Sequence, residues 1–171
     1  MFKRLSMVAA VAVVCLVAAT TASAATQTLS LTRCLSSGNG GTYTTADDIV
    51  ATINWNTLTL SQMQNFLAAQ SGSFAVVTQG ETAYRNFVQS DFMWSSPTPA
   101  ISTLQYNNHT RTYNVYRSTL TVNLGTFPVP GTYSLNMVAT TDRPTNDGVY
   151  GSQPAGDWLT ITNCQITIVP A

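Results

Sequence analysis

The residues able to support nucleophilic catalysis are few in this sequence. His109 is the only histidine, and it lies in the segment Asn107-Asn108-His109-Thr110-Arg111. A serine or cysteine nucleophile needs a base that a third group orients, and no G-x-S-x-G motif is present. Asp91 or Asp142 would have to be brought in by the fold to orient this histidine. We therefore interpret His109 as a turn residue at a hairpin tip and expect a non-enzymatic protein.

The acidic residues also offer little catalytic or metal chemistry. Glycoside hydrolysis needs two carboxyl groups that flank one bond, whereas the adjacent Asp47 and Asp48 would point to opposite sides of a strand. The stretch Asp142–Gly148 is as rich in oxygen ligands as a calcium loop, but it lacks the EF-hand pattern and its final glutamate. Solvated turns explain both stretches, so we expect no metal and no cofactor.

Aromatic and amide side chains point to a different chemistry. Neutral sugars bind to aromatic faces surrounded by amide and carboxylate hydrogen-bonding groups. Trp94 and Tyr150 lie beside polar stretches, and Asn146 and Asp147 closely precede Tyr150. These four residues are our candidate ligand contacts, with glycans as candidate partners. The remaining aromatic residues are explained more simply by packing in a core or on a sheet face.

Residues 1–24 have the three parts of a secretory signal peptide. Lys3 and Arg4 form the basic start, Met7–Ala19 is apolar, and Ala22-Ser23-Ala24 is an A-x-A cleavage site. The apolar run is too short to cross a bilayer, so we expect no membrane span. A domain of residues 25–171 is then exported through a periplasm to the cell surface or the medium. The sequon Asn108-His109-Thr110 carries meaning only if the host glycosylates proteins.

Two cysteines, Cys34 and Cys164, remain after removal of residues 1–24. An even pair in an oxidising compartment predicts one disulfide bond. The bond needs Cα atoms within about 7 Å, so we expect the first and last strands to lie side by side or to face each other.

The charge of the predicted mature chain excludes one class of partner. It contains no lysine, and its five arginines against seven acidic residues give a net charge near −2. Nucleic acids and anionic membrane surfaces attract basic patches, so we expect neither as a partner.

Alternating apolar residues predict short strands along most of the chain. Ile49–Trp55 and Tyr133–Ala139 alternate clearly, and Thr28–Arg33 alternates with Leu29 and Leu31 on one side. Ser36–Thr42 is a glycine-rich predicted loop. In Arg111–Leu124 the alternation shifts near Arg117, which predicts a bulge or a break between two strands. The pattern favours an all-β sandwich formed by one domain.

One short helix interrupts the predicted strands. Ser61 and Gln64 have the spacing of a capping box at its start, and Gly72 suits its end. Met63, Phe66 and Leu67 share one face of this helix, so we expect it to close one edge of the sandwich.

The segment Leu120–Met137 resembles a recurring part of chaperone–usher fimbrial subunits and adhesin domains. A strand leads into Phe127-Pro128-Val129-Pro130-Gly131, then Gly131-Thr132-Tyr133 opens a second strand. Gly156-Asp157-Trp158 is a second strand entry of this kind. The resemblance implies an immunoglobulin-like sandwich, a periplasmic chaperone, and assembly with copies of itself or other appendage subunits.

Two features depart from the typical subunit pattern. Typical pilins place both cysteines in the N-terminal half, whereas Cys34 and Cys164 join the two ends of this chain. The stretch before Cys34 is also short for a donor strand, and Leu29 and Leu31 are its only good anchors for strand exchange. A tip or minor subunit, or a self-contained surface domain, fits these departures.

Three hypotheses follow from the sequence. The first is an exported, non-enzymatic structural or adhesive subunit of a bacterial pilus-like or fimbria-like appendage. The second is a self-contained secreted carbohydrate-binding, lectin-like module. The third is a small secreted hydrolase.

Overall fold

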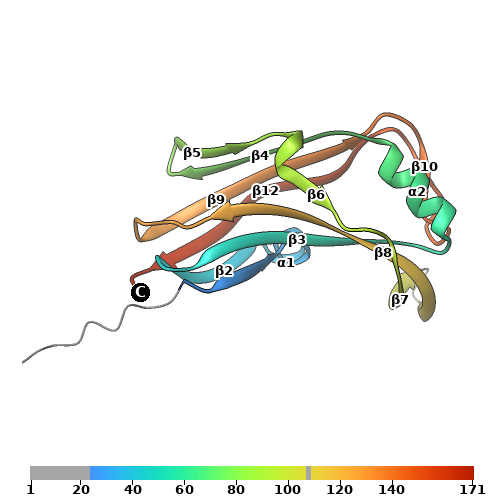
Figure 1. The fold of residues 1–171 in the computed structure, drawn as a ribbon, viewed down its shortest axis with the longest axis horizontal. Helices are drawn as coiled ribbons and strands as arrows, with labels where there is room; N and C mark the ends of the chain where they lie inside the picture. Colours follow the sequence, from blue (N-terminus) through green and yellow to red (C-terminus); the bar gives the residue numbers. More distant parts are fainter. Residues whose placement is uncertain (1–23, 107–108) are drawn as a thin grey trace, which may run out of the picture.

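Two β-sheets packed face to face contain most of the described chain, which comprises residues 24–106 and 109–171. In this computed structural model the first sheet has the strand order β1-β3-β8-β6, with β7 also paired to β8, and the second has the order β2-β12-β9-β4-β5 (Figure 1). The predicted signal peptide, apart from its last residue, and Asn108 of the sequon lie outside the described residues.

The strands of the first sheet are β1 (Thr26–Ser30), β3 (Asp48–Thr57), β6 (Phe92–Trp94), β7 (Thr98–Tyr106) and β8 (His109–Gly125). Those of the second sheet are β2 (Asn39–Thr44), β4 (Gln70–Gln79), β5 (Thr82–Phe87), β9 (Gly131–Thr141) and β12 (Gly156–Val169). A small ribbon pairs β10 (Thr145–Asn146) with β11 (Ser152–Gln153). The helices are α1 (Leu31–Ser37), α2 (Leu60–Ala68) and the 3-10 turn η1 (Gln89–Asp91).

The core lies between the two sheets and follows the predicted alternation. Each strand points every second side chain inward, and these inward side chains are buried on β3 and β9 as predicted. The β3 set is Ile49, Ala51 and Ile53, and the β9 set is Tyr133, Leu135, Met137 and Ala139. The prediction of an all-β sandwich is therefore confirmed.

The N-terminal segment differs from its prediction. The strand ends at Ser30, whose hydroxyl accepts a hydrogen bond from the Arg33 backbone N–H, and α1 follows. Gly38 ends α1 in the left-handed conformation at φ 66°, which glycine adopts without strain. The sequence prediction of one helix is therefore wrong, because Leu29 and Leu31 give a short strand pattern that continues smoothly into a capped helix.

The predicted glycine-rich loop is also partly a strand. Residues from Asn39 onward form β2, which pairs in parallel with β12. A Cβ atom at Gly40 would lie 2.9 Å from the Gln165 carbonyl oxygen and 3.1 Å from the Cys164 Sγ. Glycine here permits the close approach of two backbones rather than a flexible loop.

The predicted disulfide is present and joins Cys34 to Cys164, with a Cα–Cα distance of 5.2 Å. Cys164 lies on the last strand, β12, as expected. Cys34 lies on α1, the helix that directly follows the first strand, rather than on a strand, so the bond involves the first strand only through the helix that continues it. The bond joins α1 to β12 across 130 residues of sequence.

Helix α2 begins and ends two residues earlier than the range Gln62–Gln70 that follows from the predicted cap at Ser61. Its capping box is formed by Thr59 and Gln62: the Thr59 side chain accepts from the Gln62 N–H, and the Gln62 side chain accepts from the Thr59 N–H. Ser61 and Gln64 have the same spacing, so the sequence contains two overlapping capping signals. Gly72 lies within β4, and the residue that caps the C-terminal end of the helix is Ala69, which has right-handed geometry.

Strand β8 is continuous, so the predicted break near Arg117 is wrong. Its pairing with β3 and β7 shows no register shift in that region. The burial pattern does change: Val115 is buried on one face, whereas Ser118, Leu120 and Val122 are buried on the other. The covering of the strand changes where β8 leaves β3 and continues as a hairpin with β7, and this explains the shift without a bulge.

Candidate functional site

Four aromatic side chains from four elements meet at one end of the sandwich. Trp55 of β3 stacks on Phe66 of α2 with ring centroids 4.5 Å apart, and Trp158 of β12 contacts both rings at 5.2 Å. Trp94 of β6 lies 5.4 Å from Phe66 and 5.7 Å from Trp158. We call Trp55, Phe66, Trp94 and Trp158 the aromatic cluster. It contains all three tryptophans of the chain.

The loop that follows β9 is attached to both ends of α2. At the C-terminal end of the helix, the Asp142 N–H donates to the Ala69 carbonyl, and Arg143 donates to the Ala68 carbonyl. At the N-terminal end, the Leu58 N–H donates to the Asp147 carbonyl at 2.9 Å. These contacts place residues 147–153 beside the aromatic cluster, at the end of the sandwich occupied by α2 and β10 (Figure 1).

Asn146 and Asp147, two of the predicted ligand contacts, hold the shape of this loop. The Asn146 side-chain oxygen accepts from the Gly148 N–H at 2.7 Å. One Asp147 carboxylate oxygen accepts from the N–H groups of Val149 and Tyr150, both at 2.8 Å. Asp147 is only 6% exposed. Its main contribution is therefore to present Tyr150, which is 46% exposed.

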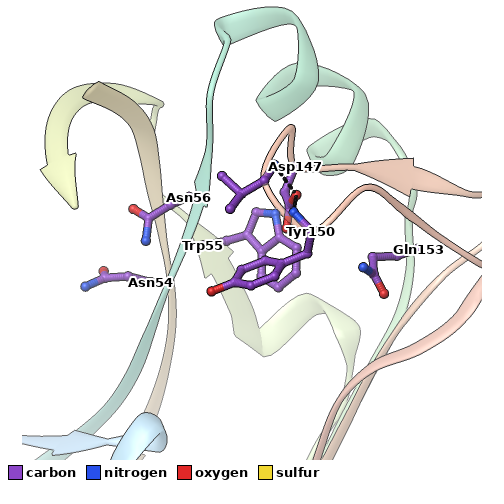
Figure 2. Close-up of a pocket in the computed structure, with 7 residues that line it drawn as sticks. Asn54, Trp55, Asn56, Asp147, Tyr150 and Gln153 are labelled. Carbon is purple, nitrogen blue, oxygen red and sulfur yellow. Dashed lines mark hydrogen bonds between the residues drawn. The ribbon is translucent and has the colours of Figure 1, made fainter. Parts of the chain in front are cut away.

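A pocket of about 340 Å³ lies between this loop and β3 (Figure 2). This volume is at the lower end of the range for small-molecule sites. Figure 2 shows Trp55 and Tyr150 together on one side of β3, the Asn54 and Asn56 side chains on the other side of this strand, and Gln153 beyond Tyr150. Its lining residues are Asn54, Trp55, Asn56, Asp147, Val149, Tyr150 and Gln153.

A second hollow, of about 190 Å³, adjoins the first and shares Trp55 and Gln153 with it. Its other lining residues are Pro154, Ala155, Asp157 and Trp158. We call the two hollows together the aromatic groove. Of the four predicted ligand contacts, Asp147 and Tyr150 line the groove, whereas Trp94 packs in the aromatic cluster and Asn146 shapes the loop.

The end of β1 explains why side chains from both faces of β3 line the groove. Strand β1 pairs with β3 only from Asp48 to Thr52, so Ile53–Thr57 have a strand partner, β8, on one side only. Trp55 points inward and its neighbours Asn54 and Asn56 point outward, since side chains alternate along a strand. Because no strand covers this edge of β3, the inward Trp55 and the outward Asn54 and Asn56 all border the same hollow.

Neighbouring side chains orient both asparagine amides. Thr119 donates to the Asn54 side-chain oxygen at 2.8 Å, and the Arg117 Nε donates to the Asn56 side-chain oxygen at 2.9 Å. With the oxygens engaged in this way, the –NH₂ groups are the hydrogen-bond donors that remain. The lining of the larger hollow therefore includes two amides of fixed orientation in addition to the exposed Tyr150 ring.

The indole nitrogens of Trp55 and Trp158 differ in their partners. The Trp158 Nε1 donates to the Gln70 side-chain oxygen at 3.0 Å. Within residues 24–106 and 109–171, the buried Trp55 Nε1 has no hydrogen-bond partner. A buried donor without a partner costs about 1–3 kcal/mol, so Trp55 is the residue of the groove whose polar group is least satisfied by the fold.

Hydrogen bonding and burial shift the pKa values of several groups on β2 and β9, in the turn before β3 and in the loop attached to α2. Hydrogen bonds from the Thr44 backbone and side chain lower the pKa of Asp47, and burial raises the pKa of Tyr43 and Tyr133. The Arg143 guanidinium lowers the pKa of Asp142 in the attached loop. These interactions are structural. The lining of the groove consists of aromatic, amide, carboxylate and small apolar side chains.

The remaining predicted residues lie elsewhere. Leu29 and Leu31 are fully buried in the core of their own chain. His109 begins β8 opposite Tyr106 and is exposed. In the part of the chain that the structure describes, no group of three or more histidine, cysteine or acidic side chains could hold a metal ion. The same residues include no helix with the length and apolar character needed to cross a membrane.

Sequence reasoning missed Asn54, Asn56 and Gln153 and predicted Trp55 only as an inward strand residue. The signal available was the triplet Asn54-Trp55-Asn56, in which two amides flank a large aromatic residue on a strand.

Comparison with protein-family models, curated proteins and solved structures gave no match to this chain.

Proposed function

We propose that this protein is an exported, non-enzymatic, lectin-like domain that binds neutral glycans through the aromatic groove. The observation that carries the proposal is the lining of the larger hollow, which combines the exposed Tyr150 ring with the side chains of Asn54 and Asn56. A sugar offers apolar C–H faces and hydroxyl groups around its ring. An aromatic face with oriented amide donors complements both.

The use of the groove carboxylates supports binding rather than catalysis. One carboxylate oxygen of Asp147 accepts hydrogen bonds from two backbone N–H groups of its own loop. These bonds fix the shape of the loop. A glycosidase would need two carboxyl groups placed on either side of one bond. Asp147 lines the larger hollow and Asp157 the smaller one, and the exposed Asp157 carboxylate is the one placed to accept hydrogen bonds from sugar hydroxyls.

Export and a self-contained fold form the second part of the proposal. The signal-peptide pattern of residues 1–24 supports passage through a periplasm to the cell surface or medium. The N-terminal strand β1 pairs within its own chain, and the two predicted anchors, Leu29 on β1 and Leu31 at the start of α1, are buried in the core. A domain that keeps its first strand does not need a neighbour to complete it, which favours a tip adhesin or a soluble lectin over a strand-donating pilin.

A glycan array tests this function directly. The protein is produced from the full-length gene and purified after export. It should bind neutral glycans, and the Tyr150→Ala variant should lose that binding. Phe74→Ala is the matched control, because Phe74 is an aromatic residue on β4 that is 50% exposed and outside the groove lining. Equal loss in both variants, or no binding by the wild type, would contradict the proposal.

A second candidate function, a subunit of a surface appendage, is favoured by strand β7. All nine residues of this strand are uncharged, and Ile101 on it is 69% exposed. Charged residues normally protect an exposed sheet edge, so an edge without them suits assembly with a second copy or another subunit. The immunoglobulin-like topology implied by the resemblance to fimbrial subunits belongs to this proposal, as does a chaperone partner.

Native mass spectrometry of the exported protein separates the two candidates. A lectin-like domain should appear as a monomer at every concentration. An appendage subunit should give a ladder of masses, and Ile101→Lys should collapse that ladder to the monomer. A ladder that Ile101→Lys leaves intact would exclude assembly through β7.

A further inference from the structure

We infer that the aromatic groove contains two adjoining subsites and takes a neutral oligosaccharide of at least two sugar units. This inference rests on the proposed glycan-binding function and adds to it the length and charge class of the ligand. The structural basis is that the two hollows share Trp55 and Gln153 as lining residues.

The shared residues make the two hollows neighbours rather than separate sites. Trp55 borders the larger hollow and Trp158 borders the smaller one, and their rings meet edge to face with centroids 5.2 Å apart. Two linked units can therefore occupy both hollows without leaving the surface of the aromatic cluster.

Each hollow has its own means of holding one unit. In the larger one, the Tyr150 ring offers an apolar face and the Asn54 and Asn56 amides offer donors. The smaller hollow combines the apolar surface of Pro154 and Trp158 with the exposed carboxylate of Asp157. A carboxylate accepts hydrogen bonds from vicinal hydroxyls, so the two subsites bind in complementary ways: the larger one mainly donates and the smaller one mainly accepts.

The charge of the lining selects neutral ligands over acidic ones. It includes Asp147 and Asp157 and contains no lysine, arginine or histidine. The nearby Arg117 is bonded to Asn56 and to the Ile101 carbonyl. Like charges repel at short range, so uronic and sialic acids are disfavoured at both subsites.

Isothermal titration calorimetry with a defined panel tests the inference. The neutral probes are glucose, galactose, mannose and N-acetylglucosamine, each as the monosaccharide and as its homodisaccharide. Galacturonic acid and its disaccharide are the acidic probes. For at least one neutral pair, the disaccharide should bind roughly tenfold or more tightly than its monosaccharide, because the second subsite adds hydrogen bonds.

Variants of the smaller hollow separate the subsites. Asp157→Asn, and Ala155→Phe as a blocking change, should remove most of the disaccharide gain and leave monosaccharide affinity unchanged. Glu81→Gln is the matched control, because it removes one exposed negative charge outside both hollows. Tyr150→Ala should weaken both probe lengths.

The outcomes distinguish this inference from the function on which it rests. Equal affinity for monosaccharide and disaccharide, or equal loss of both in Asp157→Asn, would overturn the second subsite and leave glycan binding intact. Preferential binding of the galacturonic probes would overturn the neutral class. Absence of binding by every saccharide in the panel would overturn both the inference and the proposed function.

Discussion

The two tryptophans that border the groove differ in one hydrogen bond, and this difference predicts different costs of substitution. Trp158 donates to Gln70, whereas the buried Trp55 Nε1 has no partner among the described residues. Trp158→Phe removes a donor and leaves the Gln70 oxygen unpaired, so it should lower the free energy of unfolding by about 1–3 kcal/mol from the hydrogen bond alone.

Trp55→Phe should be less costly in this respect than Trp158→Phe. It keeps an aromatic ring against Phe66, which lies 4.5 Å away, and removes a buried donor that the fold leaves unsatisfied. Urea denaturation of both variants measures the difference. A larger loss in Trp55→Phe than in Trp158→Phe would contradict the assigned partners.

Asp47 predicts how stability depends on pH. Its carboxylate accepts from the Thr44 N–H at 2.7 Å and the Thr44 hydroxyl at 2.9 Å, and these bonds hold its pKa below the usual value. The ionised form is therefore favoured in the folded state. Its stabilising effect is fully present above the unfolded pKa of about 3.9 and is lost as the pH falls through the lower folded pKa.

Thermal melts across this acidic range test the role of Asp47. The wild type should be more stable than Asp47→Asn at neutral pH, and the difference should shrink as the pH falls below about 4. A difference that stays constant with pH would show that the Asp47 charge makes no contribution.

At the scale of elements, the contact between the groove loop and α2 is tight at Gly148. Gly148 and Gly151 have similar positive φ angles, 84° and 87°. A Cβ atom at Gly148 would lie 2.9 Å from Leu58 and from Gln62, whereas one at Gly151 would have no atom within 4 Å. A substitution at Gly151 therefore introduces backbone strain alone. The same substitution at Gly148 introduces this strain and, in addition, crowding against Leu58 and Gln62 near the start of α2.

Alanine substitutions at these two positions form a matched pair. Gly151→Ala should cost only the left-handed backbone penalty, about 1–2 kcal/mol. Gly148→Ala should cost this and a further ~1–3 kcal/mol from overpacking, and it should also weaken saccharide binding by displacing Tyr150. Chemical denaturation and calorimetry measure the two effects. Equal losses would contradict the tight contact with α2.

An element could be predicted when neighbouring residues in the sequence alone determine it, and not when contacts between distant segments do. Strands β3 and β9 could be predicted because their alternation is uninterrupted, and Cys34–Cys164 because two cysteines allow only one pairing. Helix α1 could not, because its apolar residues continue the strand pattern of β1. The groove could be predicted only in part, through Tyr150 and Asp147, since the role of Asn54 and Asn56 depends on where β1 ends beside β3.

At the scale of the whole molecule, the disulfide ties the N-terminal segment to the last strand. Cys34 and Cys164 close a loop with a sequence separation of 130 residues. Such a bond restricts the unfolded chain, and its removal from a small exported domain typically costs about 2–5 kcal/mol. The double variant Cys34→Ser/Cys164→Ser should lose stability by this amount in denaturant titrations. No change in stability between this variant and the wild type would contradict that role.

The most direct test of glycan binding uses the tryptophans themselves, because all three lie in the aromatic cluster beside the groove. Their fluorescence should change saturably when the protein is titrated with a neutral disaccharide of the panel. Tyr150→Ala should abolish this change, and Phe74→Ala should retain it. No change with any neutral saccharide, or the same change in Tyr150→Ala as in the wild type, would contradict the assignment of the aromatic groove as the binding site.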